Sequence, residues 1–252
     1  MKKRKIIAVT SSRADFSIQK ELVKELKKKA NLKLIVTGTH FSRKHGMTWK
    51  EIKKQNIKID YKIEVIRNKK KIINQTEIAS KILLKSAEIL NDFKPDIILI
   101  LGDRFEMHAI ASSALILRIP IVHIHGGELT SGAFDDALRH SITKMSHVHI
   151  VAHDTYKKRI IQMGENPNSV FSVGSLSIDN IKKIKFLSKI ELENKLNIKF
   201  KNKNLIVTFH PTTLKKDSGL VEISNLLNTL KKLRDTLVIF TTNNIDPEAD
   251  II

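Results

Sequence analysis

Short apolar runs alternate with longer amphipathic stretches along almost the whole chain, and this alternation constrains the fold more than any other feature. Apolar runs bounded by turn residues predict strands that are buried on both faces, and the stretches between them predict crossover helices. We therefore predict an α/β protein whose strands are parallel. The predicted strands span 6–10, 32–37, 61–66, 96–101, 120–124, 148–152, 170–173, 204–209 and 237–242. The predicted helices span 16–28, 74–93, 106–117, 136–145, 155–163, 178–184 and 220–233.

The alternation is interrupted between Lys182 and Asn204, where the sequence is charged and less periodic. We predict an N-terminal Rossmann-like domain over 1–175, a connecting helix and linker with a short helix over 176–203, and a second α/β domain that begins at 204 and runs to 252. Two strands and one helix are too few to cover both faces of a parallel sheet. We therefore expect that a natural C-terminal half is missing or that the reading frame ended early. The alternative is a small complete subdomain that docks on the first.

The composition bears on partners and location. The net charge of +19 suggests nucleic acid, but the lysines lie on predicted helix faces and in linkers, and aromatic residues make up only 5% of the chain. We therefore predict no nucleic-acid partner, and expect the positive charge to help attract an anionic small substrate. There is no cysteine, which excludes disulfides and thiolate chemistry. No apolar stretch is long enough to span a bilayer, so we predict no membrane partner and a soluble, cytoplasmic protein.

Polar and charged residues follow the predicted strands at the points where the strands end. In open α/β sheets, ligands bind in the crevice beyond the carboxyl ends of the strands. The candidate site residues at or near these ends are Arg13, Asp15, His40, Asp103, Arg104, His125, Glu128, Asp136, Arg139, His210 and Asn244. Most of them fall between Pro95 and His149, and we expect the centre of the site there.

The segment that follows the first predicted strand contains neither a GxGxxG turn nor a P-loop. It offers instead a helix N-terminus with hydroxyl side chains and Arg13, which is a plausible anion site. The alternative is structural, with Ser12 capping the helix and Arg13 paired with Asp15. His40 follows the second strand, where a lone histidine is more often a solvated loop residue than a catalyst.

Asp103 and Arg104 allow two interpretations as well. They can orient a base or grip a phosphate, or they can form a structural ion pair that caps the helix beginning at Glu106.

Five histidines lie close together in the sequence, at positions 123, 125, 140, 147 and 149. Their spacing is not that of an HExxH zinc motif, and His147 and His149 on a strand point to opposite faces, so we predict no metal site. Acid–base or hydrogen-bonding roles suit neutral imidazoles near Glu128 and Asp136 better. The Gly126-Gly127 pair allows the backbone to approach a ligand closely.

Taken together, the sequence resembles the hydrolysing UDP-N-acetylglucosamine 2-epimerases, with the bacterial sialic-acid-pathway branch as the nearest likeness. The resemblance covers essentially the whole chain. It rests on six motifs in the family's order, namely Ser12-Arg13-Ala14-Asp15, Gly102-Asp103-Arg104, His123-Ile124-His125-Gly126-Gly127-Glu128, Arg139-His140-Ser141-Ile142-Thr143-Lys144-Met145, Val173-Gly174-Ser175 and Phe209-His210-Pro211. It implies a GT-B-like fold, in which two Rossmann-type domains face each other across a cleft and the second binds the nucleotide.

The resemblance implies a reaction without redox cofactor or metal, on a UDP-sugar. UDP leaves from C1 while the C2 proton is removed, and water then adds to the glycal to give N-acetylmannosamine with inverted C2. Asp103, Asp136, His125 and Glu128 are the implied catalytic residues, and His125 stands where many members of the family carry glutamate. Arg13 and His210 match positions on the diphosphate side. The other implied substrate-binding residues are Asp15, His40, Arg104, Arg139 and Asn244.

Three alternatives remain open at this point. The same reaction on a UDP-diacetamido-trideoxyhexose would serve a legionaminic-type pathway. A GT-B glycosyltransferase would transfer the sugar to an acceptor, and an inactive remnant would show no turnover. The family is commonly dimeric or tetrameric, so we expect a homo-oligomer when the protein is full length.

Overall fold

The computed structural model describes residues 3–65, 73–131, 133–209 and 219–241. The chain divides into two compact units, which are treated separately below. The first comprises Met1–Leu129 and Asp135–Lys183, and the second comprises Thr130–Phe134 and Ile184–Ile252. The division falls after α7 (Leu176–Lys183), because Asn180 of this helix donates hydrogen bonds from Nδ2 to the carbonyl oxygens of Ser17 and Ile18 on α1.

The first unit is built on a sheet of seven strands, in the order β3-β2-β1-β4-β5-β6-β7 within the described residues. Every adjacent pair is parallel, as predicted. The strands are β1 (Lys5–Thr10), β2 (Asn31–Val36), β3 (Tyr61–Lys62), β4 (Ile97–Leu101), β5 (Ile121–Ile124), β6 (Val148–Val151) and β7 (Val170–Ser172). The direction of winding reverses between β1 and β4, which is the switch point where open α/β sheets bind ligands.

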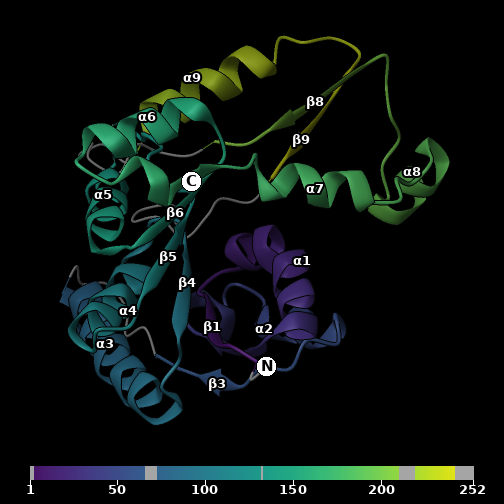
Figure 1. Cartoon of the computed structure of the whole chain (residues 1–252). Helices are drawn as coiled ribbons and strands as arrows, with labels where there is room; N and C mark the ends of the chain where they lie inside the picture. Colours follow the sequence, from purple (N-terminus) through teal and green to yellow (C-terminus); the bar gives the residue numbers. More distant parts are fainter. Residues whose placement is uncertain (1–2, 66–72, 132, 210–218, 242–252) are drawn as a thin grey trace. The chain divides into compact units, whose positions relative to one another are not determined.

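Helices cover both faces of this sheet (Figure 1). They are α1 (Arg13–Lys29), α2 (Trp49–Lys54), α3 (Ile73–Phe93), α4 (Phe105–Ile116), α5 (Asp135–Met145), α6 (Asp154–Gln162) and α7, with 3-10 turns η1 (Gly38–Phe41) and η2 (Pro167–Ser169). Alternate residues of each strand enter different cores, as the pleat requires. Ile98 and Ile100 of β4 pack with α3, α4 and α5, whereas Leu99 and Leu101 pack in the core that includes α1 and α2.

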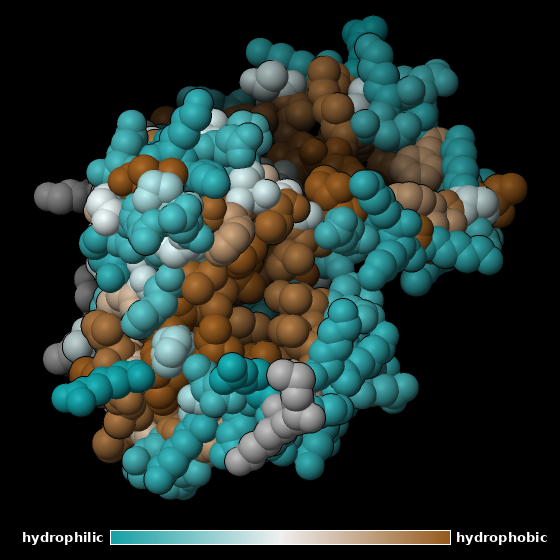
Figure 2. All heavy atoms as spheres, viewed as in Figure 1, coloured by the Kyte–Doolittle hydropathy of each residue, from teal (hydrophilic) through white to brown (hydrophobic). Residues whose placement is uncertain are grey.

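Apolar side chains on the outer surfaces of α3 and α4 lie outside these cores. Leu84 is 62% exposed and Ile116 is 72% exposed. Figure 2 shows hydrophobic atoms, in brown, at the surface in the region of these two helices. In the part of the chain that the structure describes, no helix is both long enough and apolar enough to cross a membrane.

The second unit contains α8 (Lys189–Leu196), β8 (Lys203–Val207), α9 (Leu220–Leu230) and β9 (Thr236–Phe240). The two strands pair in parallel, with α9 between them in the sequence, so the predicted β-α-β unit is present. The short helix expected before it is α8, which begins with a capping box formed by Ser188 and Glu191.

Most of the predicted elements are confirmed, with two kinds of difference. Within the described residues 61–65 of the strand predicted over 61–66, the strand itself covers Tyr61 and Lys62, and Ile63 adds a backbone hydrogen bond to the Val36 carbonyl oxygen; β3 lies at the edge of the sheet. Helix α1 begins at Arg13, three residues before the predicted start, because Ser12 caps it there. The helix α2 and both 3-10 turns were not predicted.

Candidate active site

The strands around the switch point end at the same level. The register pairs Thr10 of β1 with Val36 of β2, and Leu101 of β4 with Ile124 of β5. The residues that follow these strands therefore lie along one edge of the sheet. This edge brings together the segments that carry most of the predicted site residues.

The segment after β1 is held by a carboxylate. Asp15 is buried, and its Oδ2 accepts hydrogen bonds from the Ser11 backbone N at 3.1 Å and the Ser11 Oγ at 2.7 Å. Ser12 Oγ accepts from the Asp15 backbone N at 3.2 Å, so the predicted N-cap is confirmed. The alternative pairing of Arg13 with Asp15 is wrong, because the Asp15 carboxylate is turned towards Ser11. Arg13 is exposed at the first turn of α1 and forms no ion pair with the described residues.

His40 is fully buried, so the expectation of a solvated loop residue is wrong. Its Nε2 lies 2.9 Å from Thr10 Oγ1, and its Nδ1 lies 2.8 Å from Thr48 Oγ1. Burial, which outweighs the attraction of Asp15, lowers the pKa of this imidazole to about 4. His40 is therefore neutral at pH 7 and ties the ends of β1 and β2 to the segment before α2. Its contact with a substrate stays a prediction.

Asp103 and Arg104 do not pair with each other, so the second interpretation, a structural Asp103–Arg104 ion pair, is wrong. The Arg104 guanidinium instead binds the buried Glu106 through two hydrogen bonds, of 3.1 and 3.2 Å. Gly38 packs against this pair, since a Cβ at position 38 would lie 3.0 Å from Glu106 Oε1 and 2.6 Å from the Ser11 carbonyl oxygen. Arg104 is thus fixed at the junction of the β2 and β4 ends.

Arg139, on α5, joins three parts of the site. It is 5% exposed, and its Nη2 donates to Asp103 Oδ2, beyond β4. Its Nη1 donates to the Glu128 carbonyl oxygen at 2.9 Å and to Asp136 Oδ1 at 3.3 Å. A buried arginine requires such partners, because an unpaired charge in the interior is costly. The predicted residues Asp103, Asp136 and Glu128 are brought together around it.

The segment after β5 carries a second pair of ionisable groups. His125 Nδ1 lies 2.8 Å from Glu128 Oε1, and since a carboxylate only accepts, Nδ1 carries the proton and Nε2 remains for other partners. The hydrogen bond from His125 holds the pKa of Glu128 below its usual value. His125 has a φ of 65°, a left-handed conformation that is rare for a residue with a side chain and is often found at functional sites.

The glycines of this segment are required by packing. A Cβ at Gly126 would lie 2.8 Å from His123 Nδ1, and Gly127 combines a φ of 77° with a Cβ position 2.6 Å from the Tyr156 carbonyl oxygen. The prediction that they allow a ligand to approach closely is not tested. What they allow here is the close approach of two elements of the protein itself.

The remaining predicted residues are placed less fully. His140 Nε2 lies 3.7 Å from Asp136 Oδ2, one turn away on α5. His210 and Asn244 lie outside the described residues. Within the described ranges, no group of three or more His, Cys, Asp or Glu side chains is arranged to hold a metal ion.

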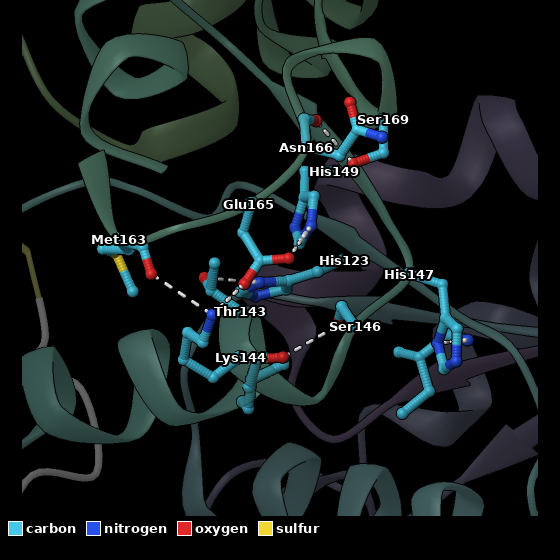
Figure 3. A network of polar contacts seen from close by, with 12 residues as sticks. His123, Thr143, Lys144, Ser146, His147, His149, Met163, Glu165, Asn166 and Ser169 are labelled. Atoms are coloured by element: carbon cyan, nitrogen blue, oxygen red, sulfur yellow. Dashed lines mark hydrogen bonds and ion pairs between the residues drawn. The ribbon is translucent and has the colours of Figure 1, made fainter. Parts of the chain in front are cut away.

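A polar network surrounds His123 and His149, two of the five histidines named in the sequence analysis, but the network itself was not predicted (Figure 3). His123 of β5 and His149 of β6 are register partners, and both are fully buried. His149 Nε2 lies 3.2 Å from Glu165 Oε2, and Glu165 also binds Lys144 Nζ at 2.5 Å. His147 lies apart from them in Figure 3 and instead accepts a hydrogen bond from the Ile121 backbone N, as the expected alternation of faces requires. The sequence signal that could have revealed this network is the presence of a histidine inside each of two otherwise apolar strands.

Comparison with known proteins gives a consistent family. The family model described as UDP-N-acetylglucosamine 2-epimerase matches residues 24–252. The GDP/UDP-N,N'-diacetylbacillosamine 2-epimerase (hydrolyzing) of Campylobacter jejuni subsp. jejuni serotype O:2 is 41% identical over 254 residues, which cover 100% of this chain and 66% of the relative. The polysialic acid biosynthesis protein P7 of Escherichia coli is 36% identical over 252 residues, covering 99% and 64%. The chain thus spans slightly less than two thirds of the length of these curated relatives.

Among solved structures, the UDP-N-acetylglucosamine 2-epimerase from Neisseria meningitidis bound to UDP-GlcNAc matches with a TM-score of 0.81 at 22% identity. The match covers 97% of this chain and 67% of that one. At this level of identity the likeness concerns the fold, and it confirms the predicted α/β, GT-B-like class.

Proposed function

We propose, on the premise that this chain belongs to the UDP-N-acetylglucosamine 2-epimerase family, that the protein is a hydrolysing UDP-sugar 2-epimerase. The observation that carries the proposal is the cluster around Arg139, which gathers Asp103, Asp136 and the backbone of Glu128 at the switch-point edge of the sheet. Acid–base groups at such an edge suit a reaction that moves protons on a bound nucleotide sugar.

The proposed reaction has two stages. In the first, a base removes the proton on C2, the C1–O bond breaks, and its electron pair leaves with the diphosphate of UDP, so that a C1=C2 double bond remains in the glycal. In the second, water supplies the oxygen bound to C1 and a proton is delivered to C2 on the opposite face. The sum is UDP-sugar plus water giving UDP and the free 2-epimer, which needs at least one base and one acid.

We assign the proton transfers to His125 and Glu128 together with Asp103 and Asp136. The Glu128 carboxylate accepts a hydrogen bond from Nδ1–H of His125, which leaves Nε2 of the ring to accept or deliver a proton. Asp103 is oriented by the buried Arg139. The roles proposed for Arg13, Asp15, His40, Arg104 and Arg139 are to bind and orient the substrate, with exposed Arg13 at the start of α1 directed to the diphosphate. His210 and Asn244 are proposed to add contacts from the second domain.

For the sugar, we propose UDP-N,N'-diacetylbacillosamine as the first candidate. The support is the 41% identity to the Campylobacter relative named for that substrate, against 36% to the Escherichia coli relative named for polysialic acid biosynthesis. UDP-N-acetylglucosamine, the substrate first expected from the sequence, is the second candidate because it names the family.

The test is release of UDP from each of the two nucleotide sugars, with NMR of the sugar product in D2O. We expect UDP, a free sugar inverted at C2, and deuterium at C2. The assay is run on the 252-residue chain and on a chimera in which this chain replaces the aligned segment of the Campylobacter relative. If the chimera folds by circular dichroism and neither protein releases UDP, the proposal is wrong. Transfer of the sugar to an acceptor would support a glycosyltransferase instead.

A further inference from the structure

His123 lies inside β5 and is fully buried, yet both of its ring nitrogens have polar partners. Nε2 lies 2.8 Å from the Gly102 carbonyl oxygen, and Nδ1 lies 3.1 Å from Thr143 Oγ1. Figure 3 shows the ring directed at Thr143 on α5. A carbonyl oxygen only accepts, so Nε2 of the neutral ring carries the proton and Nδ1 is an acceptor. The single hydroxyl proton of Thr143 is shared between Nδ1 and the Arg139 carbonyl oxygen, to which Thr143 Oγ1 donates at 3.0 Å.

The three segments that this ring touches are the three that form the Arg139 cluster. Gly102 directly precedes Asp103 at the end of β4. Thr143 is one helical turn beyond Arg139, and its Oγ1 also lies 3.0 Å from the Arg139 carbonyl oxygen. Gly126, in the loop of His125 and Glu128, leaves no room for a side chain beside Nδ1. The ring therefore sits where β4, β5 and α5 meet.

The ring is uncharged at neutral pH, because burial lowers the pKa of His123 to about 4, and nearby Arg139, His125 and His149 also disfavour the charged form. A neutral ring has one donor and one acceptor, which match one carbonyl oxygen and one hydroxyl. Neither an apolar side chain nor a cationic one satisfies both partners. The position therefore specifies a neutral hydrogen-bonding ring and not merely a bulky one.

We infer that His123 is a positioning residue of the active site, whose ring fixes the Gly102 backbone against α5 and so holds Asp103 in register with Arg139. It does not face the substrate and acts through these neighbours. This inference rests on the proposed epimerase function for its kinetic readout, whereas the geometry of the ring is testable without turnover.

His149 supplies a matched control. It is also fully buried, and it is the register partner of His123 on the next strand. Its ring, however, binds Glu165 rather than a segment of the site. A purely structural role for buried histidines predicts the same outcome at both positions. A positioning role predicts different outcomes.

The kinetic test compares His123→Phe, His123→Gln and His149→Phe in whichever of the chain and the chimera releases UDP. For His123→Phe we expect kcat to fall about 10- to 100-fold with little change in KM, because misplacing a catalytic group harms the transition state most. His123→Gln keeps a donor near the Nε2 position and should restore most of the loss. His149→Phe should lower the stability but leave kcat of the folded protein unchanged. Equal kcat in both Phe variants, or no recovery with Gln, overturns the inference.

The second test needs no activity. Long-range 1H–15N NMR of the histidine rings in the 252-residue chain at pH 7 should show His123 protonated on Nε2 and unprotonated on Nδ1. The resonance of the Arg139 Nη protons should change in His123→Phe and not in His149→Phe. A His123 ring protonated on Nδ1, or an unchanged Arg139 signal, refutes the positioning role. If these spectra are as expected but UDP is never released, the proposed function fails and not the geometry.

Discussion

Lowering the pH from 7.5 to 5 should destabilise the first compact unit, because His40 and His123 are buried there in their neutral forms. Both are fully buried, and burial lowers the pKa of each to about 4. In the unfolded chain a histidine has a pKa of about 6.5. Above pH 6.5 neither state binds the proton, so the folded unit has its full stability. As the pH falls below 6.5, the unfolded chain gains protons that the folded unit cannot accept until about pH 4.

The size of the effect follows from these values. At pH 5, linkage between protonation and folding gives a loss of about 2 kcal/mol for each histidine relative to pH 7.5, or about 4 kcal/mol for the two. Most carboxylates are still ionised at pH 5, so they contribute little in this window. Burial also lowers the pKa values of His149 and His108, which adds to the loss. Since domains are stable by about 5–15 kcal/mol, the loss is a large fraction of the total.

The assay is urea unfolding at pH 7.5, 6.5, 5.5 and 5 at constant ionic strength. It is followed by the fluorescence of Trp49, which is the single tryptophan of the chain and lies in the first unit. His40→Gln removes one titrating group and should cut the pH-dependent loss by about 2 kcal/mol, whatever its effect on stability at pH 7.5. The reasoning is refuted if the free energy of unfolding changes by less than about 1 kcal/mol between pH 7.5 and 5, or if His40→Gln keeps the full dependence.

Three further substitutions test the geometry of the site. Gly127→Ala would place a Cβ 2.6 Å from the Tyr156 carbonyl oxygen at a left-handed φ, so we expect a loss of about 2–4 kcal/mol in urea unfolding; an unchanged midpoint would contradict the packing argument. Ser12→Ala removes the N-cap of α1 and should cost about 1 kcal/mol by the same measurement, with Ser12→Asn as the neutral control. Arg139→Met should cost about 3–5 kcal/mol and abolish UDP release, and residual turnover above a tenth of wild type would show that the cluster is dispensable.

The fold was largely predictable because its signal is local. Apolar runs such as Ile97–Leu101 are buried on both faces, and helices such as α1, α3 and α5 carry clear apolar stripes. The helix Trp49–Lys54 was missed because six residues hold less than two turns of periodic pattern. The two residues of β3 depend on an edge position that sequence periodicity does not reveal.

The sequence predicted which residues belong to the candidate site better than it predicted which of these residues bind each other. Strand ends and polar residues placed Asp103, His125 and Glu128 at one edge. Sequence neighbours suggested that Asp103 pairs with Arg104, whereas Asp103 binds Arg139 on another helix and Arg104 binds Glu106. Long-range pairing of this kind depends on how α5 packs on the sheet, which a single sequence does not specify.

The place of β1 in the sheet has a consequence for how the chain is made. β1 leaves the ribosome before β2 and β4, but it lies between them in the sheet. Its partner on one side is complete at Val36, whereas its partner on the other side begins only at Ile97. At synthesis rates of about 5–20 residues per second, a nascent chain therefore carries one open, apolar strand edge for several seconds. Chaperone binding during this interval, or a translation rate matched to it, would protect the newborn chain from aggregation.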